Sequence, residues 1–116
     1  LTVYLGIDCA NEENGCVQII EKSHKGGLVN PTHPSGFLTP EQAEIHCKKD
    51  IKKVFLNQGD IVILHNQAIH GSDTNRSNIS RRALSVCYMD ATTKTINQKY
   101  HEDYPIVFEQ LAGSLK

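Results

Sequence analysis

The residues whose types and spacing could do chemistry lie in one stretch, 59–88. Its aliphatic run Ile61–Leu64 predicts a strand that is apolar on both faces and therefore covered on each side. A short extended piece follows, and because strand side chains alternate, His70 and Ser72 are expected to share one face. Arg81 opens the next predicted strand. In an antiparallel pair the end of one strand lies beside the start of the next, so these three residues should meet at one mouth of a sheet.

The strand that begins at Arg81 predicts a pocket for a small anion. On the face of Arg81 it carries only the small side chains Ala83, Ser85 and Cys87, which leaves volume beside a fixed cation. Guanidinium binds a carboxylate through two parallel hydrogen bonds and keeps its charge when it is desolvated. An imidazole nearby, such as that of His70, would supply a metal ligand. The stretch therefore predicts a carboxylate-binding pocket next to a metal ligand.

The same residues carry a resemblance to an enzyme family. Their spacing is similar to the distal-histidine and cosubstrate-arginine segment of the phytanoyl-CoA dioxygenase family, and the upstream stretch 5–25 resembles a second block of that family. That block usually ends Pro-Gly-Ser-His, whereas Glu21-Lys22 stands here in place of Pro-Gly. The matching residues of the first segment are His70-Gly71-Ser72, Asn75-Arg76-Ser77 and Arg81-Arg82-Ala83-Leu84-Ser85. Two blocks in the right order are fairly specific, and together they cover most of residues 2–90.

The resemblance implies an Fe(II)- and 2-oxoglutarate-dependent oxygenase on a double-stranded β-helix, a cupin-like jelly roll. In such an enzyme His70 would bind the iron, Arg81 would anchor the far carboxylate of 2-oxoglutarate, and Ser72 would add a hydrogen bond to it. The family's other metal ligands form a His-x-Asp pair on a strand before the first block, and this chain begins at Leu1, already inside a predicted strand. We therefore expect 1–116 to be a single domain, the C-terminal part of the fold, that by itself binds metal weakly or not at all.

Two other functions stay open. Some relatives replace the carboxylate ligand by a small residue, which opens a coordination site for halide, and then halogenate; the deciding residue lies upstream of Leu1. A non-catalytic cupin-like binding module is the second alternative, because the missing ligands favour it for this chain. The letters His-Glu-Asp at 101–103 come after the distal histidine in a polar segment, and we interpret them as a coincidence. The substrate is expected to be a small molecule of a kind that the sequence leaves open.

Each of these residues also has an ordinary structural explanation. His70 could be a turn histidine bound to backbone, and Arg82, on the opposite face of its strand, is the natural candidate for a surface ion pair. His65 ends the apolar strand and is predicted to be structural. Asp8 and Asn14 are predicted to hold loops rather than bind substrate.

The rest of the chain predicts a mainly β fold with one or two short helices. Residues 2–7 and 16–20 are predicted strands, joined as a hairpin by the turn signal Asn14-Gly15. Thr39-Pro40-Glu41-Gln42 has the pattern of a capping box with proline at the first helical position, so a short helix should run to about Lys48. The remaining predicted elements are a loop at 23–36, strands at 51–56, 68–72 and 81–88, and a helix at 105–111.

Charge and composition exclude several classes of protein. A net charge of −1, with both signs mixed along the chain, gives no nucleic-acid or membrane footprint. No apolar run approaches the ~20 residues of a membrane-spanning helix. The four cysteines lack CxxC spacing and predict free thiols of a reducing compartment, taken as the cytoplasm. A zinc site is disfavoured for the same reason; its ligands would be Cys9, Cys16, His46 and Cys47.

The predicted strands also bear on assembly. Thr2–Ile7 and Ile61–Leu64 are apolar on both faces, and unpaired edges with such residues invite association. Because two-fold pairs are the commonest closed symmetry, we expect a homodimer or a higher homo-oligomer.

Overall fold

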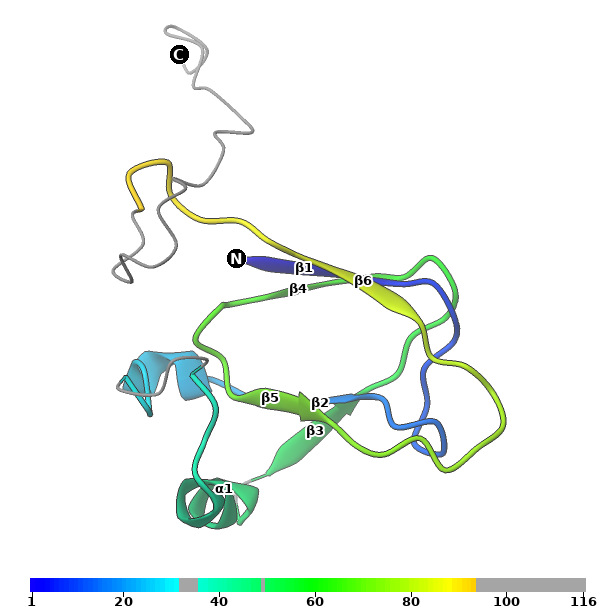
Figure 1. The fold of residues 1–116 in the computed structure, drawn as a ribbon, viewed down its shortest axis with the longest axis horizontal. Helices are drawn as coiled ribbons and strands as arrows, with labels where there is room; N and C mark the ends of the chain where they lie inside the picture. Colours follow the sequence, from blue (N-terminus) through cyan, green and yellow to red (C-terminus); the bar gives the residue numbers. More distant parts are fainter. Residues whose placement is uncertain (32–35, 49, 94–116) are drawn as a thin grey trace, which may run out of the picture.

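A computed structural model gives the structure of residues 1–31, 36–48 and 50–93. Two antiparallel three-stranded sheets face each other, which confirms the predicted mainly β class and is compatible with a cupin-like jelly roll (Figure 1). The first sheet has the order β4-β1-β6 and the second has the order β3-β2-β5. The bounds of the strands are Thr2–Gly6 for β1, Val17–Ile20 for β2, Ile51–Val54 for β3, Ile61–Leu64 for β4, His70–Ser72 for β5 and Ala83–Cys87 for β6.

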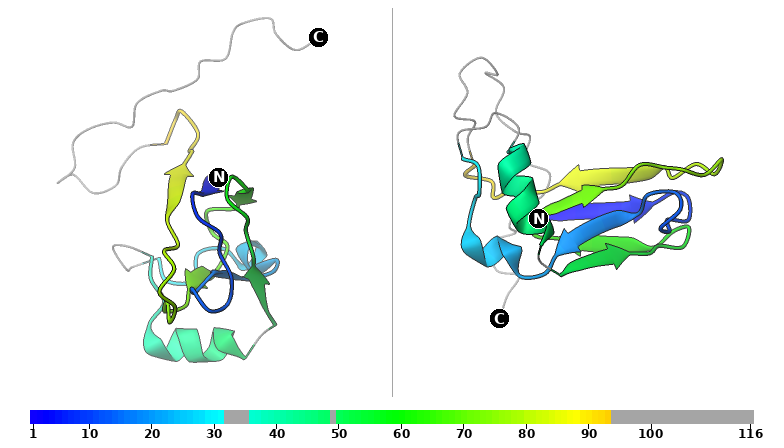
Figure 2. Two further views of the ribbon diagram at one scale, coloured as in Figure 1. Left: turned by 90° about the vertical axis from the view of Figure 1, so that its right-hand side faces the viewer. Right: turned by 90° about the horizontal axis from the view of Figure 1, so that it is seen from below.

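The chain passes repeatedly from one sheet to the other. Strand β1 pairs with β4 and β6, while β2 pairs with β3 and β5, so the predicted hairpin of 2–7 with 16–20 is wrong. The turn at Asn14-Gly15 exists, but the loop that contains it crosses between the sheets. Strands β5 and β6 likewise belong to different sheets and lie at the same side of the molecule (Figures 1 and 2). The consecutive strands β5 and β6 therefore face each other across the space between the sheets.

The core lies between the two sheets and is small. Ala10, Cys16 and Leu56 are buried together, and partly buried side chains of both sheets pack against them, namely Tyr4, Val54 and Val62. The backbones of Ala10 and Leu56 also bond to each other, at 2.8 and 3.0 Å. This cluster fixes the distance between the sheets at the end of the molecule where the loop 7–16 crosses.

The outer face of the first sheet is not covered by the described residues. In β4, Leu64 is buried, whereas Ile61 and Ile63 are 60% and 62% exposed. The expectation that this strand is covered on each side is therefore wrong for the part of the chain that the structure describes. Leu84 and Val86 of β6 continue the exposed apolar face. The predicted homodimer stays a prediction.

The helix follows from its local sequence. Helix α1 spans Pro40–Cys47 and lies on the side of the second sheet that faces away from the first (Figures 1 and 2). The Thr39 hydroxyl accepts a hydrogen bond from the Gln42 amide at 3.3 Å, and the Gln42 side chain accepts one from the Thr39 amide at 2.9 Å. The predicted capping box and helix are thus confirmed. A short 3₁₀ helix, η1 (Ser23–Gly26), lies in the stretch predicted as loop.

Two sequence predictions concern the C-terminal residues. The expected helix at 105–111 and the letters His-Glu-Asp at 101–103 lie outside the described residues. Within the described residues, no helix combines the length and the apolar character that crossing a bilayer requires.

Asparagine side chains hold the loop that connects β1 to β2. Asn14 is 1% exposed, and its Oδ1 accepts a hydrogen bond from the Asn11 amide at 2.7 Å while its Nδ2 donates to the Cys9 carbonyl at 2.8 Å. Gly15 follows with φ +78°, and a Cβ at this position would lie 2.3 Å from the Asp73 carbonyl oxygen. Glycine is needed here because both the backbone angle and the close approach exclude a side chain.

Replacing Gly15 tests that close approach. We expect Gly15→Ala to reduce the free energy of unfolding by more than Gly59→Ala does. Gly59 also has a positive φ, +89°, but a Cβ there would meet nothing within 4 Å. The left-handed backbone costs either alanine about 1–2 kcal/mol, and the overlap with Asp73 should add roughly 1–3 kcal/mol at position 15 only. Urea denaturation of both variants measures the difference, and equal losses would contradict the prediction.

Candidate functional site

Arg81 connects the two sheets through its guanidinium group. Its Nη1 lies 3.5 Å from the Tyr4 hydroxyl on β1 of the first sheet and 3.5 Å from the Ser72 hydroxyl on β5 of the second. Its Nε donates to the backbone carbonyl of Asn14 at 2.8 Å. Arg81 and Ser72 therefore meet, as the sequence predicted. They meet across the space between the sheets, and the expectation of one shared sheet mouth is wrong because β5 and β6 do not pair.

The charge of Arg81 is not neutralised by the described part of the chain. The side chain is half-buried, yet within residues 1–31, 36–48 and 50–93 it forms no ion pair with a carboxylate. A partly desolvated cation is stabilised by an opposite charge within ~4–6 Å. The hydroxyls of Tyr4 and Ser72 lie beside it and can donate hydrogen bonds to the same anion. The arrangement is therefore suited to bind a small carboxylate.

His70 stands on the same strand as Ser72 and is held in one tautomer. In β5 the two residues are two positions apart, so their side chains point to the same face. His70 Nδ1 lies 2.7 Å from the Ala68 carbonyl oxygen. Because a carbonyl only accepts, Nδ1 carries the proton and the lone pair is on Nε2. Metal-binding histidines are commonly oriented by this kind of hydrogen bond, so the ring is suited to act as a ligand through Nε2.

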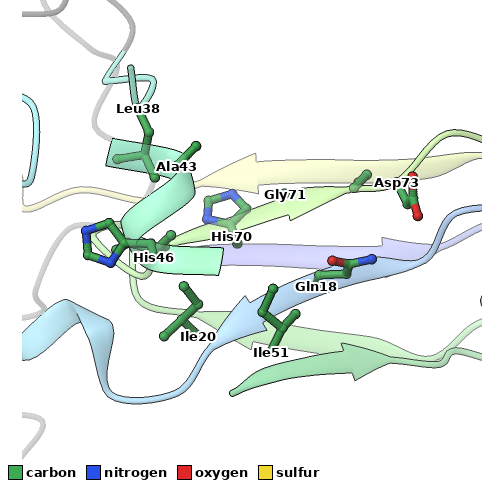
Figure 3. Close-up of a pocket in the computed structure, with 11 residues that line it drawn as sticks. Gln18, Ile20, Leu38, Ala43, His46, Ile51, His70, Gly71 and Asp73 are labelled. Carbon is green, nitrogen blue, oxygen red and sulfur yellow. The ribbon is translucent and has the colours of Figure 1, made fainter. Parts of the chain in front are cut away.

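A pocket lies next to His70. It has a volume of about 410 Å³ and is formed between α1 and the second sheet, and Figure 3 shows His46 and His70 on its wall. Its apolar wall comes from Ile20 and Ile51 of the sheet and from Ala43 of the helix. A second pocket of about 420 Å³ also includes His70 in its lining. The histidine therefore lies at the rim of two open pockets.

A complete metal centre is not present in the described residues. No group of three His, Cys, Asp or Glu side chains in them lies close enough to hold a metal ion. Cys9, Cys16 and Cys87 are free thiols. The fixed tautomer of His70 and the unneutralised Arg81 nevertheless fit the roles that the resemblance implies, one metal ligand and the anchor of a dicarboxylate.

The residues that were predicted to be structural form contacts of that kind. Arg82 pairs with Asp8 at 2.9 Å between Nη2 and Oδ1, as expected of the arginine on the outward face. His65 stacks on His24 with ring centroids 4.8 Å apart. The Asn14 side chain holds its loop. Lys52 likewise pairs with Glu21, at 2.8 Å.

Two contributors to the site were missed in the sequence. Tyr4 occupies an inward position of β1, opposite Ser85 of β6 in the register. The sequence does place Tyr4 on the same face of its strand as Thr2 and Gly6. That this face contributes to the site became clear only from the pairing of β1 with β6. The carbonyl of Asn14 had no signal, because a backbone acceptor is the same at every residue.

The carboxylate of Asp8 receives an unusual number of hydrogen bonds. Its Oδ2 accepts from the Ser80 hydroxyl at 2.9 Å, from the Arg82 amide at 2.8 Å and from Arg82 Nε at 2.9 Å, and its Oδ1 accepts from Arg82 Nη2. The hydrogen bonds from the Arg82 side chain and amide, together with that from Ser80, hold the pKa of Asp8 well below its ordinary value.

Comparison with known proteins gives consistent matches. The model of the phytanoyl-CoA dioxygenase family matches residues 1–83. Phytanoyl-CoA dioxygenase 1 of Oryza sativa is 32% identical over 92 residues, which are 76% of this chain and 32% of that protein. The 2-aminoethylphosphonate dioxygenase of the uncultured bacterium HF130_AEPn_1 is 28% identical over 97% of this chain and 43% of its own length. The methylphosphonate hydroxylase of Gimesia maris is 26% identical over 96% and 41%.

The chain spans less than half of the length of these three relatives, between 32% and 43%. No solved structure gives a significant match to it.

The lowered pKa of Asp8 makes a testable contribution to stability. A carboxyl group whose pKa is lower in the folded state stabilises the fold above its unfolded pKa of about 3.9. That contribution is lost as the pH falls from about 4 through the folded pKa. We expect Asp8→Asn to be less stable than the wild type at pH 7 and to lose less stability on acidification below pH 4. Urea unfolding at a series of pH values measures this, and parallel curves for the two proteins would contradict it.

Proposed function

The chain belongs to the phytanoyl-CoA dioxygenase family, and we propose that it is part of an Fe(II)- and 2-oxoglutarate-dependent dioxygenase that hydroxylates a small molecule. When bound, Fe(II) and 2-oxoglutarate supply the activation of oxygen that this chemistry needs. The observation that carries the proposal is the half-buried guanidinium of Arg81, which has no carboxylate partner in the described residues and lies between two hydroxyl groups.

Arg81 would bind the far carboxylate of 2-oxoglutarate. Its Nε is occupied by the Asn14 carbonyl at 2.8 Å, which fixes the plane of the guanidinium and leaves the Nη groups to face the cosubstrate. Ser72 and Tyr4, each 3.5 Å from Nη1, would donate hydrogen bonds to the same carboxylate. Charge-assisted bonds of this kind are roughly twice as strong as neutral ones, so they set both the affinity and the orientation of the cosubstrate.

His70 would hold the metal through Nε2. Its Nδ1–H donates to the Ala68 carbonyl, which orients the ring and leaves Nε2 as the nitrogen that can bind a metal. Because His70 and Ser72 share one face of β5, a metal at the histidine and a carboxylate at the serine would lie along the same strand. An elongated dicarboxylate could span these two positions.

The substrate would bind on the face of β5 that His70 and Ser72 share, in the space between the two sheets. The apolar pocket under α1 opens on the other face of the second sheet, because its wall residues Ile20 and Ile51 pair one position away from Ile19 and His70. The three relatives are named for phytanoyl-CoA, 2-aminoethylphosphonate and methylphosphonate, and we extend to this chain only what they share, a small-molecule substrate and oxygenase chemistry.

Replacing Arg81 tests its role toward 2-oxoglutarate. In the whole protein, Arg81→Ala should weaken the binding of 2-oxoglutarate by about 30-fold or more, which corresponds to roughly 2 kcal/mol for a desolvated charge pair that loses one partner. Isothermal calorimetry with Mn(II) in place of Fe(II) measures the affinity. Arg76→Ala is the matched control, because the Arg76 side chain is 77% exposed, pairs with Asp73 and should leave the affinity nearly unchanged. Equal affinities in wild type and Arg81→Ala would refute the proposal.

Replacing His70 tests its role toward the metal. His70→Ala should lower the Fe(II) or Mn(II) affinity of the whole protein by at least roughly 10-fold and abolish 2-oxoglutarate-dependent turnover, since the site loses one of its ligands. His65→Ala is the control, because that ring stacks on His24 and has no role in the proposed site. Unchanged metal affinity in His70→Ala would show that the metal, if any, is held elsewhere.

A further inference from the structure

The carboxylate of Asp8 holds the two residues on either side of Arg81. It accepts one hydrogen bond from the Ser80 hydroxyl and three from Arg82, of which one comes from the Arg82 backbone amide at 2.8 Å. The Asp8 side chain is only 16% exposed, whereas that of Arg82 is 70% exposed. Three of these four hydrogen bonds reach Oδ2 and one reaches Oδ1, and all of them come from one three-residue segment.

The backbone around Asp8 adds to this attachment. The amides of Ile7 and Asp8 both donate to the Arg82 carbonyl, at 3.0 and 3.1 Å. The chain at Arg81 is thus fixed on both sides before β6 begins at Ala83. The same loop supplies the Asn14 carbonyl that receives Arg81 Nε. One loop therefore fixes Arg81 at its backbone and at its guanidinium.

Asp8 also separates the two adjacent arginines by charge. It neutralises Arg82 on the outer side, whereas the Arg81 side chain bonds to Asn14, Tyr4 and Ser72 and keeps its charge available between the sheets. Two-point binding of a carboxylate demands that the guanidinium be held within about 0.5 Å of the productive position. A segment free to move around Arg81 would lose that geometry, even with the arginine itself intact.

We propose that Asp8 is a positioning residue, which fixes the segment 80–82 so that Arg81 presents its guanidinium to the carboxylate of the cosubstrate. The inference rests on the proposed function, because it assigns the cosubstrate to Arg81. Asp8 itself touches neither the cosubstrate nor the metal. Its effect is expected in the affinity for 2-oxoglutarate and in KM rather than in kcat at saturating 2-oxoglutarate.

A double-mutant cycle in the whole protein tests this inference. Asp8→Asn should weaken 2-oxoglutarate binding on the order of 10-fold, the range found for residues that orient a ligand-binding group, with kcat changed by less than about twofold at saturation. In the Arg81→Ala background, Asp8→Asn should cause no further loss, because its effect acts through Arg81. Calorimetry with Mn(II) and 2-oxoglutarate measures the affinities independently of turnover.

Two control variants separate positioning from general destabilisation. Asp60→Asn removes a carboxylate that accepts hydrogen bonds from the amide and side chain of Asn57, at 2.7 and 3.1 Å, and it should leave 2-oxoglutarate affinity unchanged. If Asp8→Asn fails to fold, Ser80→Ala removes a single hydrogen bond to Asp8 and should weaken binding about threefold, the loss expected for one ordinary hydrogen bond.

The outcomes distinguish this inference from the proposed function. Wild-type affinity in Asp8→Asn, or losses that simply add in the double variant, would overturn the positioning role while leaving Arg81 as the anchor. Wild-type affinity in Arg81→Ala would overturn the anchor itself, and the positioning role with it. Weaker binding in both single variants without additivity supports the inference.

Discussion

The hydrogen bond from Arg81 Nε to the backbone carbonyl of Asn14, 2.8 Å long, joins the segment that leads into one sheet to the loop that leads into the other. Removing a guanidinium from water is costly unless its donors find acceptors. The carbonyl of Asn14 and the hydroxyls of Tyr4 and Ser72 meet part of this need with dipoles. They leave the charge itself without a counter-ion in the described residues. The fold therefore holds a cation in a state that favours the arrival of an anion.

Two adjacent arginines have different environments because strand side chains alternate. Arg81 points into the space between the sheets, and Arg82 points outward to Asp8, where it forms an exposed ion pair. Exposed pairs of this kind contribute little to stability when counted alone. The Asp8–Arg82 pair matters because the Asp8 carboxylate also accepts hydrogen bonds from the Arg82 backbone amide and the Ser80 hydroxyl. An asparagine side chain has one acceptor oxygen and could replace only part of these bonds. The same residue type thus serves as a binding group at one position and as a structural contact at the next.

The sequence predicted those features that depend on neighbouring residues and failed on those that depend on distant ones. The capping box at Thr39, the shared face of His70 and Ser72, and the outward direction of Arg82 all follow from local spacing, and the structure agrees with each. Strand pairing depends on register and on the surfaces that must be buried, which spacing does not encode. The turn at Gly15 was therefore predicted at the right position. It was wrongly assigned to a hairpin, whereas in the structure it belongs to a loop that crosses between the sheets.

The prediction that Ser72 and Arg81 meet is confirmed, but the predicted arrangement within one sheet is wrong, for the same reason. An antiparallel pair of β5 and β6 would have brought His70 and Arg81 together within one sheet. The structure brings Ser72 and Arg81 together by placing their strands in opposite sheets. Both arrangements satisfy the local pattern, because each puts the end of one strand near the start of the next. Tyr4 could contribute only in the second arrangement, since it belongs to a strand far earlier in the chain.

The loop 7–16 links the folding of the two sheets to the formation of the site. Its buried Asn14 satisfies the loop's own backbone, its Gly15 permits contact with the residues after β5, and its Asp8 fixes the residues before β6. The contacts of Gly15 and Asp8 form only when both sheets are in place, because their partners lie at the ends of two strands in different sheets. A substitution that made loop 7–16 more mobile would therefore disturb the environment of Arg81 more than the pairing of strands within either sheet. For this reason polar residues of a connecting loop, rather than the small apolar core alone, determine whether the cation between the sheets is correctly placed.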